Sequence, residues 1–106
     1  MKVLIVSMVA AICLAISASP IAVEMPDVAK KNNCIACHTI EKKLIGPAWQ
    51  VIAYKYKGDA GATGKLSTRI VKGGVGVFGP IPMPANSKMT EADIREVVTF
   101  ILGLAK

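Results

Sequence analysis

Residues 34–38 read Cys34-Ile35-Ala36-Cys37-His38, the pattern C-x-x-C-H. Two thiols separated by two residues lie on one turn of chain, and an imidazole follows them directly. His38 is the single histidine among 106 residues. Sites that need two histidines, such as a Cys2His2 zinc finger, are therefore excluded. The pattern is typical of covalent attachment of a c-type haem. Cys34 and Cys37 would form thioethers with the two vinyl groups, and His38 would bind the iron.

Three other uses of these cysteines compete with that interpretation. A disulfide between Cys34 and Cys37 would be tight and would leave His38 without a role. A thioredoxin-like pair needs a βαβ context, and no strand pattern is present. Zinc needs about four ligands, whereas two cysteines and one histidine are available once the leader is removed. Haem attachment uses all three side chains and is the favoured hypothesis.

The N-terminus has the order of a secretory signal peptide. Lys2 precedes the apolar run from Val3 to Ile16, and small residues follow at 17–19. The run has 14 residues, fewer than the ~20 that span a membrane, although an uncleaved anchor is the alternative. Cleavage could follow Ala18 or Ala22. We predict that residues 1–22 are removed and that 23–106 form one domain.

Size and composition limit what this domain can be. Hydrophobic residues make up 53% of the chain and charged residues 19%, which excludes a disordered protein. The 13 basic residues outnumber the 7 acidic ones, and the leader removes one basic residue, Lys2. A domain this small is near the size at which a core needs a covalent or metal-bound staple.

Apolar spacing and capping residues predict an all-α fold of three to five short helices. Thr90 and Asp93 resemble a capping box at the start of the last helix. The segment 73–89 is rich in Gly and Pro and is expected to be a loop that serves a site. The expected helices span 26–31, 48–57 with Gly58 as its C-cap, 65–72 and 91–105.

A second iron ligand must come from another residue type. The candidates are Met25, Met83, Met89, a lysine, or none. Met89 precedes the helix start and pairs with Ile94 as a hydrophobic staple. Met83 lies in a run with prolines at 80, 82 and 84, which stiffen the chain, so Met83 is favoured. Histidine and methionine together leave no open position, which indicates electron transfer.

Four stretches carry a family resemblance: 30–38 (KKNNCIACH), 46–48 (GPA), 72–74 (KGG) and 79–84 (GPIPMP). With them, residues 23–106 resemble class I c-type cytochromes, in particular the small bacterial c-551/c-552 group. The resemblance implies short helices wrapped around one covalently bound haem c.

The resemblance also implies roles for three residues around the iron ligands. The carbonyl of Pro47 would accept the His38 N–H, Arg69 would contact a haem propionate, and Asn86 would hydrogen-bond toward the Met83 sulfur. Phe78 departs from the pattern, because a tryptophan with an N–H donor is usual there.

The expected function is that of a soluble, monomeric, periplasmic one-electron carrier without enzymatic activity. Its partners would be proteins with acidic docking surfaces: a membrane quinol-oxidising complex, nitrite reductase, or a terminal oxidase or peroxidase. We expect no nucleic-acid binding, because no basic stripe is interleaved with aromatics, and no stable membrane insertion. A haem enzyme or gas sensor with an open iron site, and a haem-free thiol module, are the alternatives. Basic residues that could steer acidic partners are Lys30, Lys31, Lys42, Lys43, Lys55, Lys57, Lys65 and Lys72.

Overall fold

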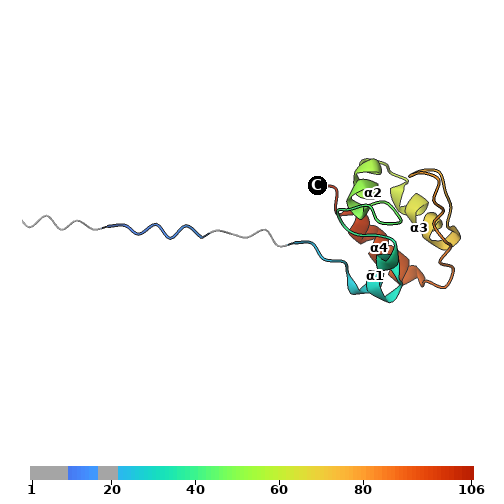
Figure 1. The fold of residues 1–106 in the computed structure, drawn as a ribbon, viewed down its shortest axis with the longest axis horizontal. Coiled ribbons are helices and arrows are strands. Elements are labelled where there is room, and N and C mark those ends of the chain that lie inside the picture. The colour runs from blue at the N-terminus through green and yellow to red at the C-terminus, as the bar shows by residue number, and fades with distance from the viewer. Residues whose placement is uncertain (1–9, 17–21) are drawn as a thin grey trace, which may run out of the picture.

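The computed structural model describes residues 10–16 and 22–106. Over this part of the chain it contains four α-helices, one 3-10 turn and no strand, so the all-α prediction is confirmed (Figure 1). The elements in chain order are α1 (Asp27–Lys31), η1 (Cys34–Ala36), α2 (Trp49–Lys55), α3 (Ala62–Lys72) and α4 (Glu91–Leu102).

Most of the expected signal peptide lies outside the described residues. Residues 1–9 and 17–21, including Ala18, are among those not described. Residues 10–16 have no regular secondary structure, and their large apolar side chains are exposed. Among the residues described, no helix combines the length and the apolar character that a membrane crossing requires. The leader and its cleavage site stay predictions.

Helix α4 is the element against which the others pack. It contacts α1, α2 and α3, and it crosses the body of the domain in Figure 1. Its stripe of apolar residues is buried, and Val97 and Val98 are among the most fully buried side chains. At its start, the Thr90 hydroxyl accepts the backbone N–H of Asp93 at 3.2 Å. This half of the expected capping box forms, whereas the Asp93 carboxylate makes contacts with Asn32 and Lys31 instead.

Five of the expected helix boundaries differ from the structure, and two of them, the starts of α1 and α2, differ by one residue. Helix α3 begins at Ala62 rather than at residue 65, because Asp59 accepts the Gly61 N–H at 2.8 Å and Ala62 is buried. Helix α2 ends at Lys55, so Gly58 lies in a following turn with φ +80° and is not the C-cap. Helix α4 ends at Leu102 and not at residue 105.

The loop over 73–89 is irregular, as expected, but it is pinned to α3. Gly73 ends that helix with φ +68°, a left-handed conformation that favours glycine. The next residue, Gly74, pairs with Met83 through two backbone hydrogen bonds of 2.8 and 3.0 Å. Further on, the Asn86 N–H donates to the Ile70 carbonyl at 2.8 Å. The loop therefore folds back on itself between Gly74 and Met83 and returns to α3 at Asn86.

Candidate functional site

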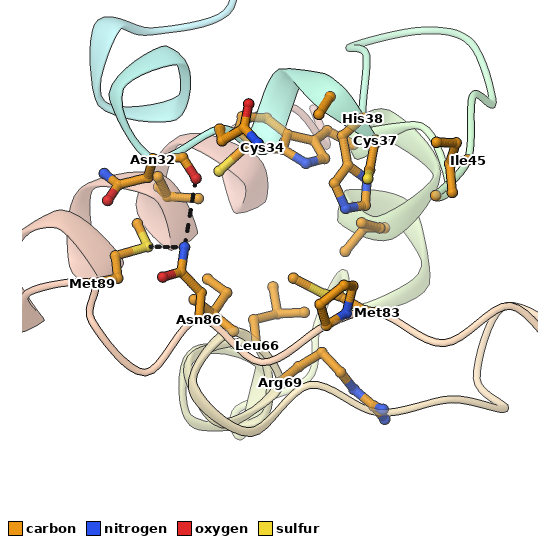
Figure 2. Close-up of a pocket in the computed structure, with 18 of the residues that line it drawn as sticks. Asn32, Cys34, Cys37, His38, Ile45, Leu66, Arg69, Met83, Asn86 and Met89 are labelled. Atoms are coloured by element: carbon orange, nitrogen blue, oxygen red, sulfur yellow. Dashed lines mark hydrogen bonds between the residues drawn. The ribbon is translucent and has the colours of Figure 1, made fainter.

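A cavity of about 510 Å³ opens between η1, α3, α4 and the 73–89 loop (Figure 2). This volume falls within the ~300–1,000 Å³ that is usual for small-molecule and cofactor sites. Its wall is mostly apolar, with Trp49, Leu66 and Ile70 among its buried members. Both cysteines of the C-x-x-C-H pattern, His38 and Met83 also line it. The two attachment residues and the two iron ligands predicted from the sequence are thus brought to one cavity.

A second cavity of about 230 Å³ adjoins the first. The two share His38, Arg69 and Met83 as lining residues, together with four apolar side chains. The second is bounded by the glycine-rich part of the loop, and Lys43, Tyr56 and Phe78 complete its rim. Cationic side chains therefore lie at this end of the site.

Cys34 and Cys37 are free, half-buried thiols at the cavity wall. The 3-10 turn η1 places them: Asn33 precedes it in the left-handed conformation, with φ +61°, and the Cys37 N–H donates to the Cys34 carbonyl at 3.2 Å. Burial raises the pKa of the Cys34 thiol, and the neighbouring Cys37 adds to the rise. Two thiols on one turn at one cavity suit double attachment to a single ring.

His38 is buried, with 8% of its surface exposed, and its ring is held from three sides. Its Nδ1 lies 2.7 Å from the carbonyl oxygen of Pro47. The α-carbon of Gly46 is so close that a β-carbon there would lie 2.6 Å from Cε1 of the ring. The Trp49 indole packs beside the imidazole, with ring centroids 6.1 Å apart. Nε2 is left as the nitrogen able to bind a metal.

Met83 is held through its main chain. Its N–H donates to the Gly74 carbonyl at 2.8 Å, and its own carbonyl accepts the Gly74 N–H at 3.0 Å. The side chain is half-buried, lines both cavities and packs against the core. The main chain of Met83 is therefore held by protein contacts alone, independently of any bond that its thioether makes.

Arg69 and Asn86 also line the larger cavity. The guanidinium of Arg69 lies against the backbone of Gly74, where a β-carbon would displace it. The Asn86 amide nitrogen lies 3.5 Å from the backbone oxygen of Asn32 and 3.9 Å from the Met89 sulfur (Figure 2). Its hydrogen bond toward Met83 stays a prediction, as does the contact of Arg69 with a propionate.

Met25 and Met89 were the other thioether candidates. Met89 is buried in the same core cluster as Ile94, in keeping with a staple at the start of α4. Met25 packs against that cluster at the N-terminal end. Sequence reasoning did not single out the contact of Asn32 with Asp93, because 61 positions separate the two residues and no local pattern joins them.

The residues present fit a haem. The cavity is concave and apolar, and it has two thiols on one turn and an imidazole whose second nitrogen is already engaged. A ring bound there would cover apolar side chains that line the hollow and would complete the small core.

Comparison with known proteins identifies the family. The cytochrome c family model matches residues 26–105. The chain belongs to the cytochrome c family. Its relatives include cytochrome c-551 of Allochromatium vinosum, 42% identical over 85% of this chain and 96% of the relative. Cytochrome c-551 of Pseudomonas aeruginosa is 51% identical over 76% of this chain and 77% of the relative.

A solved structure shows the same architecture. The wild-type cytochrome c552 of Nitrosomonas europaea superposes with a TM-score of 0.71 and 47% identity, covering 74% of this chain and 96% of that one. The resemblance to the c-551/c-552 group is therefore confirmed. So is the prediction of one covalently attached haem c as cofactor, with Cys34 and Cys37 in the attachment spacing. This cytochrome c is a haem-based electron carrier.

Proposed function

We propose that this cytochrome c carries single electrons in the periplasm with His38 and Met83 as the two axial ligands of its iron. The observation that supports this most is that both side chains line both cavities. In addition, the His38 ring is hydrogen-bonded to the Pro47 carbonyl, and the main chain of Met83 is hydrogen-bonded to Gly74. When bound, haem c supplies a one-electron iron couple whose potential rises with methionine ligation.

The contact with Pro47 sets the tautomer of His38. A carbonyl oxygen can only accept, so the ring nitrogen 2.7 Å away must be the protonated one. Nε2 then holds the lone pair that a metal requires. Gly46 and Trp49 oppose rotation of the ring, so the imidazole would keep one orientation when it binds the iron.

The loop restrains the main chain of Met83. Prolines on both sides limit the backbone angles, and the paired hydrogen bonds with Gly74 restrain the main chain. A thioether is a weak ligand, so the entropy lost on binding must be small if the bond is to persist. Ligands that move little between oxidation states suit electron transfer. Because two protein ligands would leave no iron position for a substrate, we propose no enzymatic activity.

Export and partner binding complete the proposal. Residues 1–22 would direct the chain to the periplasm, and residues 23–106 would act there as a monomer. The eight lysines named above are exposed. Among them, Lys43 lines the second cavity. Nζ of Lys55 lies 6.0 Å from the ring centroid of Phe78, which also lines that cavity. Acidic docking surfaces on a quinol-oxidising complex, nitrite reductase, oxidase or peroxidase would be attracted to this end.

The optical spectrum of Met83→Ala beside that of the wild type tests the ligand assignment. The oxidised wild type should show the far-red charge-transfer band of methionine-bound haem, and the reduced form should not bind carbon monoxide at neutral pH. Met83→Ala should lose the band and bind carbon monoxide. Met89→Leu is the matched control, because it removes a buried thioether from the same cavity and should keep the band. Identical spectra for wild type and Met83→Ala would overturn the assignment.

Export has its own measurement. N-terminal sequencing of the haem protein from the periplasmic fraction should begin at Val23. Retention of residues 1–22 in the membrane fraction would contradict this part of the proposal and leave the ligand assignment intact.

A further inference from the structure

Asn32 lies where three segments of the domain meet. Its side-chain nitrogen donates to the backbone oxygen of Val28 in α1 at 2.8 Å and to Oδ2 of Asp93 in α4 at 3.1 Å. Its own backbone oxygen lies 3.5 Å from Nδ2 of Asn86 in the 73–89 loop (Figure 2). One residue therefore touches the first helix, the last helix and the ligand loop.

Asp93 fixes this junction from the side of α4. Its side chain is 15% exposed, and Oδ2 also lies 3.0 Å from Nζ of Lys31. The hydrogen bond from Asn32, followed by that from Lys31, lowers the pKa of the Asp93 carboxyl. Because Val28 and Asp93 both take hydrogen bonds from the Asn32 side chain, its amide cannot rotate without losing one of them.

The position of Asn32 affects the first attachment residue. Asn32 is the C-cap of α1, Asn33 follows in the left-handed conformation, and Cys34 opens η1. Two residues thus separate α1 from the first thioether position. A shift of Asn32 relative to α4 would move Cys34 along the cavity wall.

Asn32 also affects the opposite wall. The main chain of Asn86 is secured by its N–H donating to Ile70 at 2.8 Å, but its side-chain amide makes long contacts, 3.5 Å to Asn32 and 3.9 Å to the Met89 sulfur. The Asn32 carbonyl is one of the two partners of this amide nitrogen, so the orientation of the amide depends in part on where that carbonyl lies. Asn86 stands three positions after Met83, on the same stretch of loop.

We infer that Asn32 and Asp93 are positioning residues that hold the Cys34 wall of the haem site in register with the loop carrying Met83, and so tune the reduction potential. The inference rests on the proposed function, because it takes Met83 as a ligand. Asp93 acts as a hydrogen-bond acceptor for the Asn32 amide, and its charge is secondary.

A redox titration of the purified holoprotein separates these two contributions. Asp93→Ala removes the acceptor and the charge, Asp93→Asn keeps an acceptor oxygen, and Lys31→Met removes the opposite charge while keeping the acceptor. Replacement of residues that hydrogen-bond to metal ligands typically costs about 10–100-fold in metal affinity or activity. Asp93 reaches Asn86 only through Asn32, two contacts beyond such a partner, so Asp93→Ala should shift the redox equilibrium about threefold, equivalent to about 28 mV for one electron. Asp93→Asn and Lys31→Met should stay close to the wild type.

Asn32→Ala provides the second variant, because it removes the amide and leaves Asp93 intact. It should shift the potential in the same direction as Asp93→Ala and weaken the far-red band. Asp59→Ala is the matched control, since it breaks an ion pair with Lys65 whose residues do not line either described cavity. That variant should leave the potential unchanged.

Three results would overturn the inference and leave the proposed function standing. An unchanged potential in Asp93→Ala and Asn32→Ala would remove it directly. Equal shifts in Asp93→Ala and Asp93→Asn, with the opposite shift in Lys31→Met, would show that charge acts through space. A similar shift in Asp59→Ala would show a general response to lost ion pairs. A wild type without the far-red band would instead remove Met83 ligation, and this inference with it.

Discussion

Replacement of Gly46 by alanine would test most directly how the imidazole of His38 is held. A β-carbon at this position would lie 2.6 Å from Cε1 and 3.0 Å from Nδ1 of the ring. Carbon atoms pack best at about 3.5–4.0 Å. Either the ring or the main chain of residue 46 must therefore move by about 1 Å.

The His38 ring has little space into which it could move. Its Nδ1 is hydrogen-bonded to the Pro47 carbonyl at 2.7 Å, and the Trp49 indole packs beside it with the ring centroids 6.1 Å apart. Overpacking of this kind costs about 1–3 kcal/mol, and loss of the ring hydrogen bond costs about 1 kcal/mol more. Gly46→Ala should therefore lower the free energy of unfolding by about 2–4 kcal/mol.

The assay is guanidinium unfolding of the oxidised holoprotein at neutral pH, followed by circular dichroism. Gly64→Ala makes the same chemical change inside α3, where a β-carbon would meet no atom within 4 Å. It should raise the free energy of unfolding by about 0.5–1 kcal/mol, because alanine favours a helix over glycine. A Gly46→Ala protein within about 0.5 kcal/mol of the wild type would refute the packing argument.

Three other outcomes are expected. Gly73→Ala should weaken the far-red band, because a β-carbon there would collide with the Met83 carbonyl; an unchanged band would contradict this. The Asn32 hydrogen bond lowers the pKa of Asp93, so its stabilising effect is complete above the ordinary pKa of about 3.9 and is lost as pH falls through the lower folded-state value. Asp93→Asn should accordingly narrow the difference in unfolding free energy between neutral and acid pH, and an unaltered pH profile would count against it. Lys43→Glu should slow electron transfer to an acidic partner and flatten its dependence on ionic strength, whereas equal rates for variant and wild type would remove the steering idea.

Local patterns predicted much of this protein because their physical causes are local. The spacing of Cys34, Cys37 and His38 follows from the reach of one turn of chain, and the family comparison confirms the haem that this spacing predicts. The apolar stripe of α4 and its Thr90 cap were also predictable, since both depend on neighbours within a few positions.

Helix boundaries were less predictable, because side chains outside each helix decide them. The start of α3 depends on Asp59, which bonds the Gly61 N–H and pairs with Lys65 across six positions. The expected start at residue 65 left the glycines at 61 and 64 outside the helix. The Asp59 hydrogen bond to Gly61, just before the helix, and the burial of Ala62 outweigh the low helix propensity of glycine.

The sequence by itself determined the attachment residues, the all-helical class and the stiffness of the chain around Met83, because each depends on covalent spacing or backbone freedom within a short segment. Only the tertiary structure decided that Gly74 pairs with Met83 and that Asp93 accepts a hydrogen bond from Asn32, which lies 61 positions away. The Asn32–Asp93 contact arises when α1 packs against α4, and the Gly74–Met83 pair forms where the loop folds back on itself, so no periodicity along the chain relates these residues.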